Sequence, residues 1–128
     1  MPLDSKFDAS RRLTVTTASG SLSFRDFLEH REALKRDPGF DASFALLLDM
    51  REVTDLSLSA EEIRMLAGRS AFSSDVRRAF VVVDPTAFGL SRMYSTHWEL
   101  EGHSGETRVF KTVEEATQWL TRETAPHL

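Results

Sequence analysis

Four short apolar runs along this chain are each followed by a segment that begins like a helix. Each run is too short for a helix and is rich in the branched and aromatic side chains that favour strands. Three of the helix starts carry a Ser or Thr followed three residues later by an acidic residue, which is the pattern of a capping box. These pairs are Ser23 and Asp26, Ser59 and Glu62, and Thr112 and Glu115. The alternation predicts an α/β fold in which a βα superhelix surrounds a mostly parallel central sheet.

The predicted sheet has four to five strands, and the apolar runs cover residues 13–16, 44–48, 79–83 and 108–110. The second run is apolar on both faces, which predicts a central strand over about 44–49. A polar break at residues 9–11 predicts an N-terminal hairpin, and Ser19-Gly20 predicts a turn after it. We expect four helices, near residues 23–36, 59–70, 86–100 and 112–122, and a loop over 51–58.

The composition indicates a single folded domain over residues 1–128. Hydrophobic residues make up 41% of the chain and charged residues 28%, which is typical of globular proteins and argues against disorder. The chain contains no cysteine. This excludes thiolate metal sites, thiol nucleophiles and disulfides, and it fits a reducing compartment.

Charge and hydropathy argue against two classes of partner. The formal net charge is −4, and the basic residues are scattered among acidic ones without a basic stripe, so we expect no binding to nucleic acid. No apolar stretch approaches the roughly 18 residues of a membrane span, and the N-terminus lacks the pattern of a secretory signal. We therefore expect a cytoplasmic protein without a membrane span.

No group of residues has the spacing of a catalytic, metal or nucleotide site. Asp49, Asp84 and Lys111 each follow a predicted strand, but the first strand supplies no acidic pair that could hold Mg²⁺. His97 has no serine or acidic partner at a fixed spacing, and the glycines do not cluster into a phosphate-binding loop. We therefore predict a protein that is not an enzyme and needs no metal or cofactor.

The segment from Arg51 to Ser59 is the most informative candidate for a functional surface. It follows a buried strand that ends with Asp49, carries the hydroxyls of Ser57 and Ser59, and ends at a helix start. A phosphate on a serine at a helix N-terminus is stabilised by the helix dipole and by backbone amides. The sequence leaves two interpretations open: Ser59 is part of a phosphorylation switch, or it is a helix N-cap with a structural role.

Three segments carry a family resemblance. They are Asp49-Met50-Arg51 after the buried strand, the middle segment 84–93, and a closing motif that runs from Val109-Phe110 through Glu115-Ala116 to Trp119-Leu120. On these motifs the chain resembles the bacterial STAS/SEC14-type proteins of the SpoIIAA-like fold. The run Leu46-Leu47-Leu48-Asp49, followed by Val53-Thr54 and a helix start that bears a serine, also resembles the STAS family, the sulphate-transporter and anti-sigma-factor-antagonist domains. The resemblance covers nearly the whole chain.

The resemblance implies a fold and a class of function. STAS domains are generally non-catalytic and bind partner proteins or small ligands, and the anti-sigma antagonists are switched by phosphorylation of a serine at the helix start after the second buried strand. Aligned without gaps, Leu58 occupies the position of that serine here. Ser59 would take the role only after a shift of one residue.

Two functions from different classes follow. The first is a non-enzymatic regulatory or protein-interaction domain of STAS-like type in bacterial signalling. The alternative is a module that binds an anionic or apolar small molecule in the crevice at the carboxyl ends of the strands, with Asp49, Arg51 and Arg92 as polar contacts. A flat surface near residues 57–59 would favour a protein partner, and a deep cleft would favour a ligand.

Self-association is a further expectation. Tyr94 and Trp98 lie four residues apart on the third predicted helix, next to the face formed by Met93 and His97. If the two aromatic side chains cannot both turn inward, they remain at the surface, where aromatic residues commonly mark contacts. The sequence therefore predicts a homodimer contact at Tyr94 and Trp98.

Overall fold

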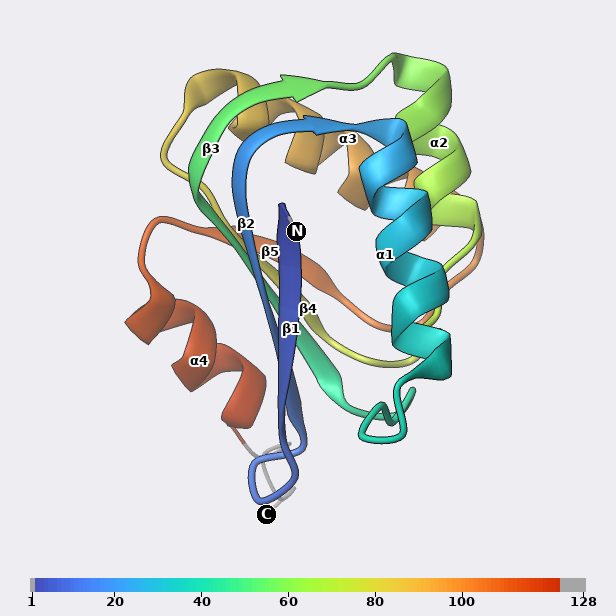
Figure 1. The fold of residues 1–128 in the computed structure, drawn as a ribbon, viewed down its shortest axis with the longest axis vertical. Coiled ribbons are helices and arrows are strands. Elements are labelled where there is room, and N and C mark those ends of the chain that lie inside the picture. The colour runs from blue at the N-terminus through green and yellow to red at the C-terminus, as the bar shows by residue number, and fades with distance from the viewer. Residues whose placement is uncertain (1, 123–128) are drawn as a thin grey trace.

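The computed structural model describes residues 2–122 of the chain. These residues form five strands and four helices (Figure 1). In chain order the elements are β1 (Leu3–Asp8), β2 (Leu13–Ser23), α1 (Phe24–Arg36), β3 (Ala45–Ser57), α2 (Ala60–Gly68), β4 (Arg78–Val81), α3 (Pro85–Leu100), β5 (Thr107–Phe110) and α4 (Val113–Thr121).

The strands form one sheet in the order β1-β2-β3-β4-β5. β1 and β2 are antiparallel, and every later pair is parallel. The prediction of a mostly parallel sheet with β3 at its centre is confirmed. In β3, Leu47 and Leu48 point to opposite faces and both are buried, because helices cover the sheet on both sides.

The handedness of the connections decides which helices share a face. α1, α2 and α3 each join a strand to its immediate parallel neighbour, always in the same direction across the sheet. Because such crossovers are right-handed, the three helices must lie on the same face. Figure 1 shows α1, α2 and α3 on one side of the sheet and α4 alone on the other.

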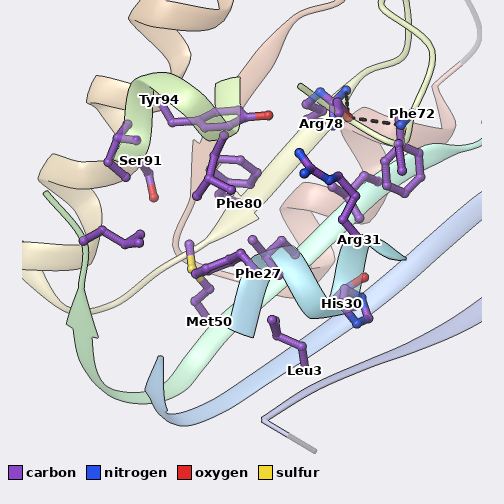
Figure 2. Close-up of a pocket in the computed structure, with 18 of the residues that line it drawn as sticks. Leu3, Phe27, His30, Arg31, Met50, Phe72, Arg78, Phe80, Ser91 and Tyr94 are labelled. Atoms are coloured by element: carbon purple, nitrogen blue, oxygen red, sulfur yellow. Dashed lines mark hydrogen bonds between the residues drawn. The ribbon is translucent and has the colours of Figure 1, made fainter. Parts of the chain in front are cut away.

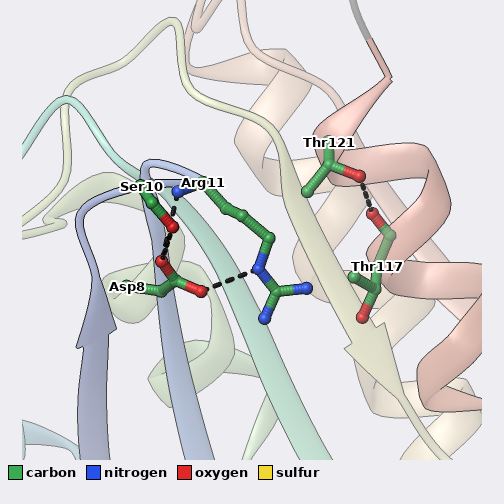
Figure 3. A network of polar contacts seen from close by, with 5 residues as sticks. All are labelled: Asp8, Ser10, Arg11, Thr117 and Thr121. Atoms are coloured by element: carbon green, nitrogen blue, oxygen red, sulfur yellow. Dashed lines mark hydrogen bonds and ion pairs between the residues drawn. The ribbon is translucent and has the colours of Figure 1, made fainter.

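A polar network at the tip of the N-terminal hairpin fixes the turn between β1 and β2 (Figure 3). The Asp8 carboxylate accepts hydrogen bonds from Ser10 Oγ at 2.7 Å and from Arg11 Nε at 2.7 Å. These bonds lower the pKa of Asp8 to about 2. Arg12, the next residue, has a φ of 52°, which the tight reversal requires. The predicted hairpin is thus confirmed, including its first arm.

Each of the four helices is preceded by an N-cap residue whose side chain accepts a hydrogen bond from a backbone amide of the first turn. Ser23 and Ser59 form complete capping boxes with Asp26 and Glu62. The side chains of Asp84 and Thr112 accept hydrogen bonds from the backbone amides of the third residue of their helices. Because these signals are local in sequence, the helix starts were predictable.

The predicted turn at Ser19-Gly20 and the predicted loop over 51–58 were both wrong. β2 and β3 continue through these segments and pair as far as Ser23 and Ser57. The register shifts twice near Gly20, whose φ is 72°, and such irregularities bend strands. Beyond Asp49, β3 has lost β4 as a neighbour, so the rest of it forms a two-stranded ribbon with β2 that arches over the helices (Figure 1). We call residues 51–57 of β3 the ribbon.

Trp98 lies in the interior rather than at the surface. Its exposed fraction is 0%, its Nε1 donates a hydrogen bond of 2.7 Å to the Gly105 carbonyl, and its ring stacks on His103 with a centroid distance of 3.7 Å. Tyr94 packs between Trp98 and Phe80. The prediction that Tyr94 and Trp98 cannot both turn inward was therefore wrong. The reason is that the segment after α3 folds back over Trp98, which a helical projection does not show.

This fold-back predicts a steric requirement at Gly105. A Cβ atom there would lie 2.1 Å from the Val76 carbonyl oxygen, so Gly105→Ala must displace backbone next to Trp98. We expect it to lower the free energy of unfolding by about 1–3 kcal/mol. Gly89→Ala is the matched control, because no neighbouring heavy atom lies within 4 Å of its added Cβ and alanine favours a helix by up to about 1 kcal/mol. Urea denaturation measures both; equal stabilities of the two variants would contradict the expectation.

Candidate functional site

A cavity lies between α1 and the α2–α3 pair, over β3 and β4 (Figure 2). α1 packs on β1 and β2, whereas α2 packs mainly on α3, so the two groups of helices leave a gap above the central strands. The cavity volume is about 140 Å³, roughly ten times the space that one water molecule requires. We call it the central cavity.

The walls of the central cavity are largely apolar, and its charged residues are all basic. The sheet and the helices contribute Leu48, Met50, Phe80, Phe27, Ile63 and Leu90 among others. Arg31, Arg69 and Arg78 also line it, and no Asp or Glu of the described residues does. An apolar hollow with a few placed polar groups is the usual form of a small-molecule site.

Arg78, at the start of β4, is the most deeply buried charge in the cavity wall, with an exposed fraction of 2%. It donates one hydrogen bond, of 2.8 Å, to Ser70 Oγ. Its guanidinium lies 3.8 Å from the centroid of the Trp98 ring and 5.5 Å from that of Phe72. Its Nε has no hydrogen-bond partner, and it forms no ion pair within residues 2–122. Burial consequently lowers the pKa of Arg78.

α1 adds two more polar side chains to the cavity. Arg31 donates a hydrogen bond of 2.9 Å to the Arg69 carbonyl, and its buried Nε has no partner in the described structure. The His30 Nε2 lies 2.8 Å from Ser5 Oγ, which in turn lies 2.7 Å from Thr16 Oγ1. Burial lowers the pKa of His30 and so favours the neutral form of the ring.

Asp49 and Arg51 lie away from the central cavity and bind each other. Arg51 Nε and its NH2 nitrogen each donate a hydrogen bond of 2.9 Å to the Asp49 carboxylate. This bidentate pair holds the pKa of Asp49 below its usual value. Asp49 follows Leu47 by two residues, so it faces α4, where Leu47 packs with Trp119. The two residues therefore neutralise each other on the opposite face of the sheet.

Near the carboxyl ends of the strands, a small hollow of about 120 Å³ lies between the ribbon and the start of α3, and Asp55 and Asp84 line it together with Thr54 and Thr86. None of Asp49, Arg51 and Arg92 lines it. Arg92 is exposed and lies over the Phe88 ring. The two carboxylates in this lining disfavour the binding of an anion. Asp49, Arg51 and Arg92, which were predicted as ligand contacts, do not come together in this hollow.

The end of the ribbon and the residue after it contribute to the central cavity. Leu56 of the ribbon and Leu58, which follows the ribbon, line the cavity, whereas Ser57 between them is exposed at the end of β3. Ser59 accepts the Glu62 amide at 3.1 Å as the N-cap of α2. Of the predicted residues, Ser57 and Ser59 thus lie beside the cavity without lining it.

Sequence analysis missed Arg78, Arg31 and His30. Arg78 directly precedes the apolar run 79–83, and a charge at a strand start is normally exposed, so nothing local indicated its burial. His30 and Ser5 are 25 residues apart and meet only because α1 packs on β1. The available signal was weak: two arginines and a histidine in or next to predicted apolar elements.

No group of three or more His, Asp or Glu side chains within residues 2–122 could hold a metal ion. None of the helices described is long and apolar enough to cross a bilayer.

Comparison with known proteins identifies relatives of this fold. The family model described as SpoIIAA-like matches residues 13–121. An uncharacterized protein of the DUF3478 family with a SpoIIAA-like fold, from Shewanella loihica PV-4, is 20% identical and covers 92% of this chain and 91% of its own, with a TM-score of 0.58. An antisigma-factor antagonist STAS domain from Rhodobacter sphaeroides is 15% identical over 97% of this chain and 94% of its own, with a TM-score of 0.31. No curated protein matches. The predicted SpoIIAA-like α/β fold is confirmed.

The environment of His30 predicts a pH dependence of stability. Burial lowers the His30 pKa from its usual value of 6.5, and the nearby Asp4 opposes this effect. The folded protein therefore binds fewer protons at His30 than the unfolded chain, so stability decreases as the pH falls through about 6.5. His30→Gln cannot ionise and should lose less stability than the wild type between about pH 7.5 and 5.5. Urea denaturation at several pH values tests this; parallel curves for the two proteins would contradict it.

The ribbon end gives a matched pair of serine variants. Ser59→Ala removes the cap of α2 and should lower the free energy of unfolding by about 1 kcal/mol. Ser57→Ala lies two residues away on an exposed strand end and should change it by less than about 0.5 kcal/mol. Thermal and urea denaturation measure both. If Ser57→Ala proved as destabilising as Ser59→Ala, the cap would not explain the effect.

Proposed function

This chain belongs to the SpoIIAA-like family, and we propose that it works as a single non-enzymatic regulatory domain whose input is an apolar small molecule bound in the central cavity. The observation that carries this proposal is the cavity itself, an apolar space of about 140 Å³ between α1 and the α2–α3 pair. Well-packed cores contain few voids larger than a water molecule. A space of this size next to a folded sheet therefore supports a ligand site rather than a packing defect.

The polar groups of the cavity support binding rather than catalysis. Ser5 and His30 form a hydrogen-bonded pair, which is part of a nucleophilic arrangement. However, no carboxylate within residues 2–122 hydrogen-bonds the His30 ring to orient it. Ser5 also shares its hydroxyl with Thr16. We propose that the Thr16–Ser5–His30 chain fixes α1 on β1 beside the ligand.

We further propose that the exposed side of the ribbon changes when the ligand binds. A protein partner or a second copy of this chain would recognise this change. Successive ribbon residues point to opposite faces. Leu56 lines the central cavity, while its neighbours Asp55 and Ser57 are exposed. Occupancy of the cavity can therefore shift Leu56 and with it the exposed side of the ribbon. This arrangement supports a regulatory surface at Arg51–Ser59, with the ligand beneath it.

The neutral probe 1-octanol tests the ligand site. In ¹H–¹⁵N correlation spectra we expect it to shift amide signals of α1, of Leu56 and Leu58, and of the start of β4, and to leave those of α4 unchanged, because α4 lies on the other face of the sheet. Ser91→Leu should suppress these shifts, because Ser91 is a small, 4% exposed residue of the cavity wall and the longer side chain fills the space.

Thr96→Leu is the matched control for Ser91→Leu. It places the same side chain on an exposed position of the same helix, away from the central cavity, and should leave the octanol-induced shifts intact. Binding that persists unchanged in Ser91→Leu, or shifts distributed evenly over both faces of the sheet, would contradict a ligand site in the central cavity.

A further inference from the structure

We infer that the ligand of the central cavity is an amphipathic monocarboxylate, whose carboxylate binds Arg78 and Arg31 while its apolar chain lies along the rest of the cavity. This inference rests on the proposed function and specifies the chemical class of its ligand. It follows from the charges in the cavity wall, which residues 2–122 leave without a counter-ion.

Arg78 is the first part of the argument. A guanidinium has five N–H donors, and at Arg78 one hydrogen bond to Ser70 is formed while the buried Nε has no partner. The residue is 2% exposed, so its charge is buried. Burying a charge is costly unless it is paired and hydrogen-bonded. An anion in the cavity would supply both the charge and the acceptors.

The aromatic contacts of Arg78 hold it in place without neutralising it. The guanidinium lies 3.8 Å from the Trp98 ring centroid and 5.5 Å from that of Phe72. These contacts fix the plane of the guanidinium, which is the arrangement that favours a planar, bidentate acceptor such as a carboxylate. Cation–π contacts leave the in-plane N–H groups free to donate.

Arg31 supplies the second cation. It comes from α1, on the opposite wall, and its buried Nε also has no hydrogen-bond partner in the described structure. Figure 2 shows the guanidinium groups of Arg31 and Arg78 toward the same end of the cavity, near Phe72, with Met50, Phe27 and Leu3 toward the other end. The cavity thus has a cationic end and an apolar end, which matches a carboxylate with an apolar chain.

Tyr94 lies near the cationic end and supports the same assignment. Figure 2 shows the Tyr94 hydroxyl pointing toward Arg78, and burial raises the pKa of that hydroxyl. A neutral phenol can donate to an anion. Since Asp and Glu are absent from the described lining, nothing there competes with a bound carboxylate for the arginines.

Octanoate and 1-octanol, which differ only in the head group, provide the test. By isothermal titration calorimetry we expect the wild-type protein to bind octanoate about tenfold to a hundredfold more tightly than octanol, the usual effect of charge-assisted hydrogen bonds. Arg78→Met should abolish this preference while octanol still binds. In ¹H–¹⁵N spectra of the wild type, octanoate should shift the side-chain N–H signals of Arg78, because its guanidinium then donates to the carboxylate.

Arg31→Met gives a second test that does not depend on the deeply buried site. Arg31 is less buried than Arg78, so its removal should weaken octanoate binding even if Arg78→Met fails to fold. Arg92→Met is the control, because Arg92 is an exposed arginine of α3 outside the cavity lining, and it should keep the wild-type preference.

The outcomes separate this inference from the proposed function. If octanoate and octanol bind with equal affinity, or if Arg31→Met and a folded Arg78→Met keep the wild-type preference, the carboxylate assignment is wrong and the apolar ligand site stands. If neither compound binds the wild-type protein, the proposed function fails and the inference fails with it. A preference for octanoate that disappears in the Arg31 and Arg78 variants and persists in Arg92→Met supports both.

Discussion

Each of the three crossovers in this protein joins a strand to its parallel neighbour, and the twist of the strands allows such a connection on one face only. α1, α2 and α3 are therefore gathered on one side of the sheet, and α4 covers the other side alone. On the three-helix side, α1 packs at the β1–β2 edge and α2 packs on α3. The central cavity is the space that remains between them, over the faces of β3 and β4.

The two faces of the sheet differ in how completely they are packed. On the α4 side, Leu47, Val81 and Trp119 form a closed apolar cluster, and the charges nearby, Asp49 and Arg51, neutralise each other. On the other side, Arg78 is buried beside an open cavity and has no counter-ion among residues 2–122. Proteins depart from consistent core packing mainly at functional sites. The contrast within one small domain is the reason why we propose a site on the three-helix side.

The accuracy of the sequence predictions followed the range of the interactions involved. Ser23, Ser59, Asp84 and Thr112 were predictable as helix caps, because a cap depends on residues three positions apart. The ribbon was predicted as a loop because its polar residues resemble a connection. It is a strand because β2 lies beside it as a partner. Trp98 was placed at the surface because its burial depends on the return of the chain at Gly105.

The sequence by itself determined the α/β class, the SpoIIAA-like family, the central position of β3 and the four helix starts. The class, the central strand and the helix starts follow from apolar periodicity and from capping patterns that are complete within a few residues. The family follows from the resemblance carried by the motifs at 49–51, 84–93 and 109–120. Only the tertiary structure decided which face of the sheet carries the cavity and that Asp49 and Arg51 lie on the other face. It also decided that Arg78 and Arg31 line the same central cavity. Burial and the pairing of charges depend on residues brought together from distant parts of the chain, and the printed order of residues does not contain those distances.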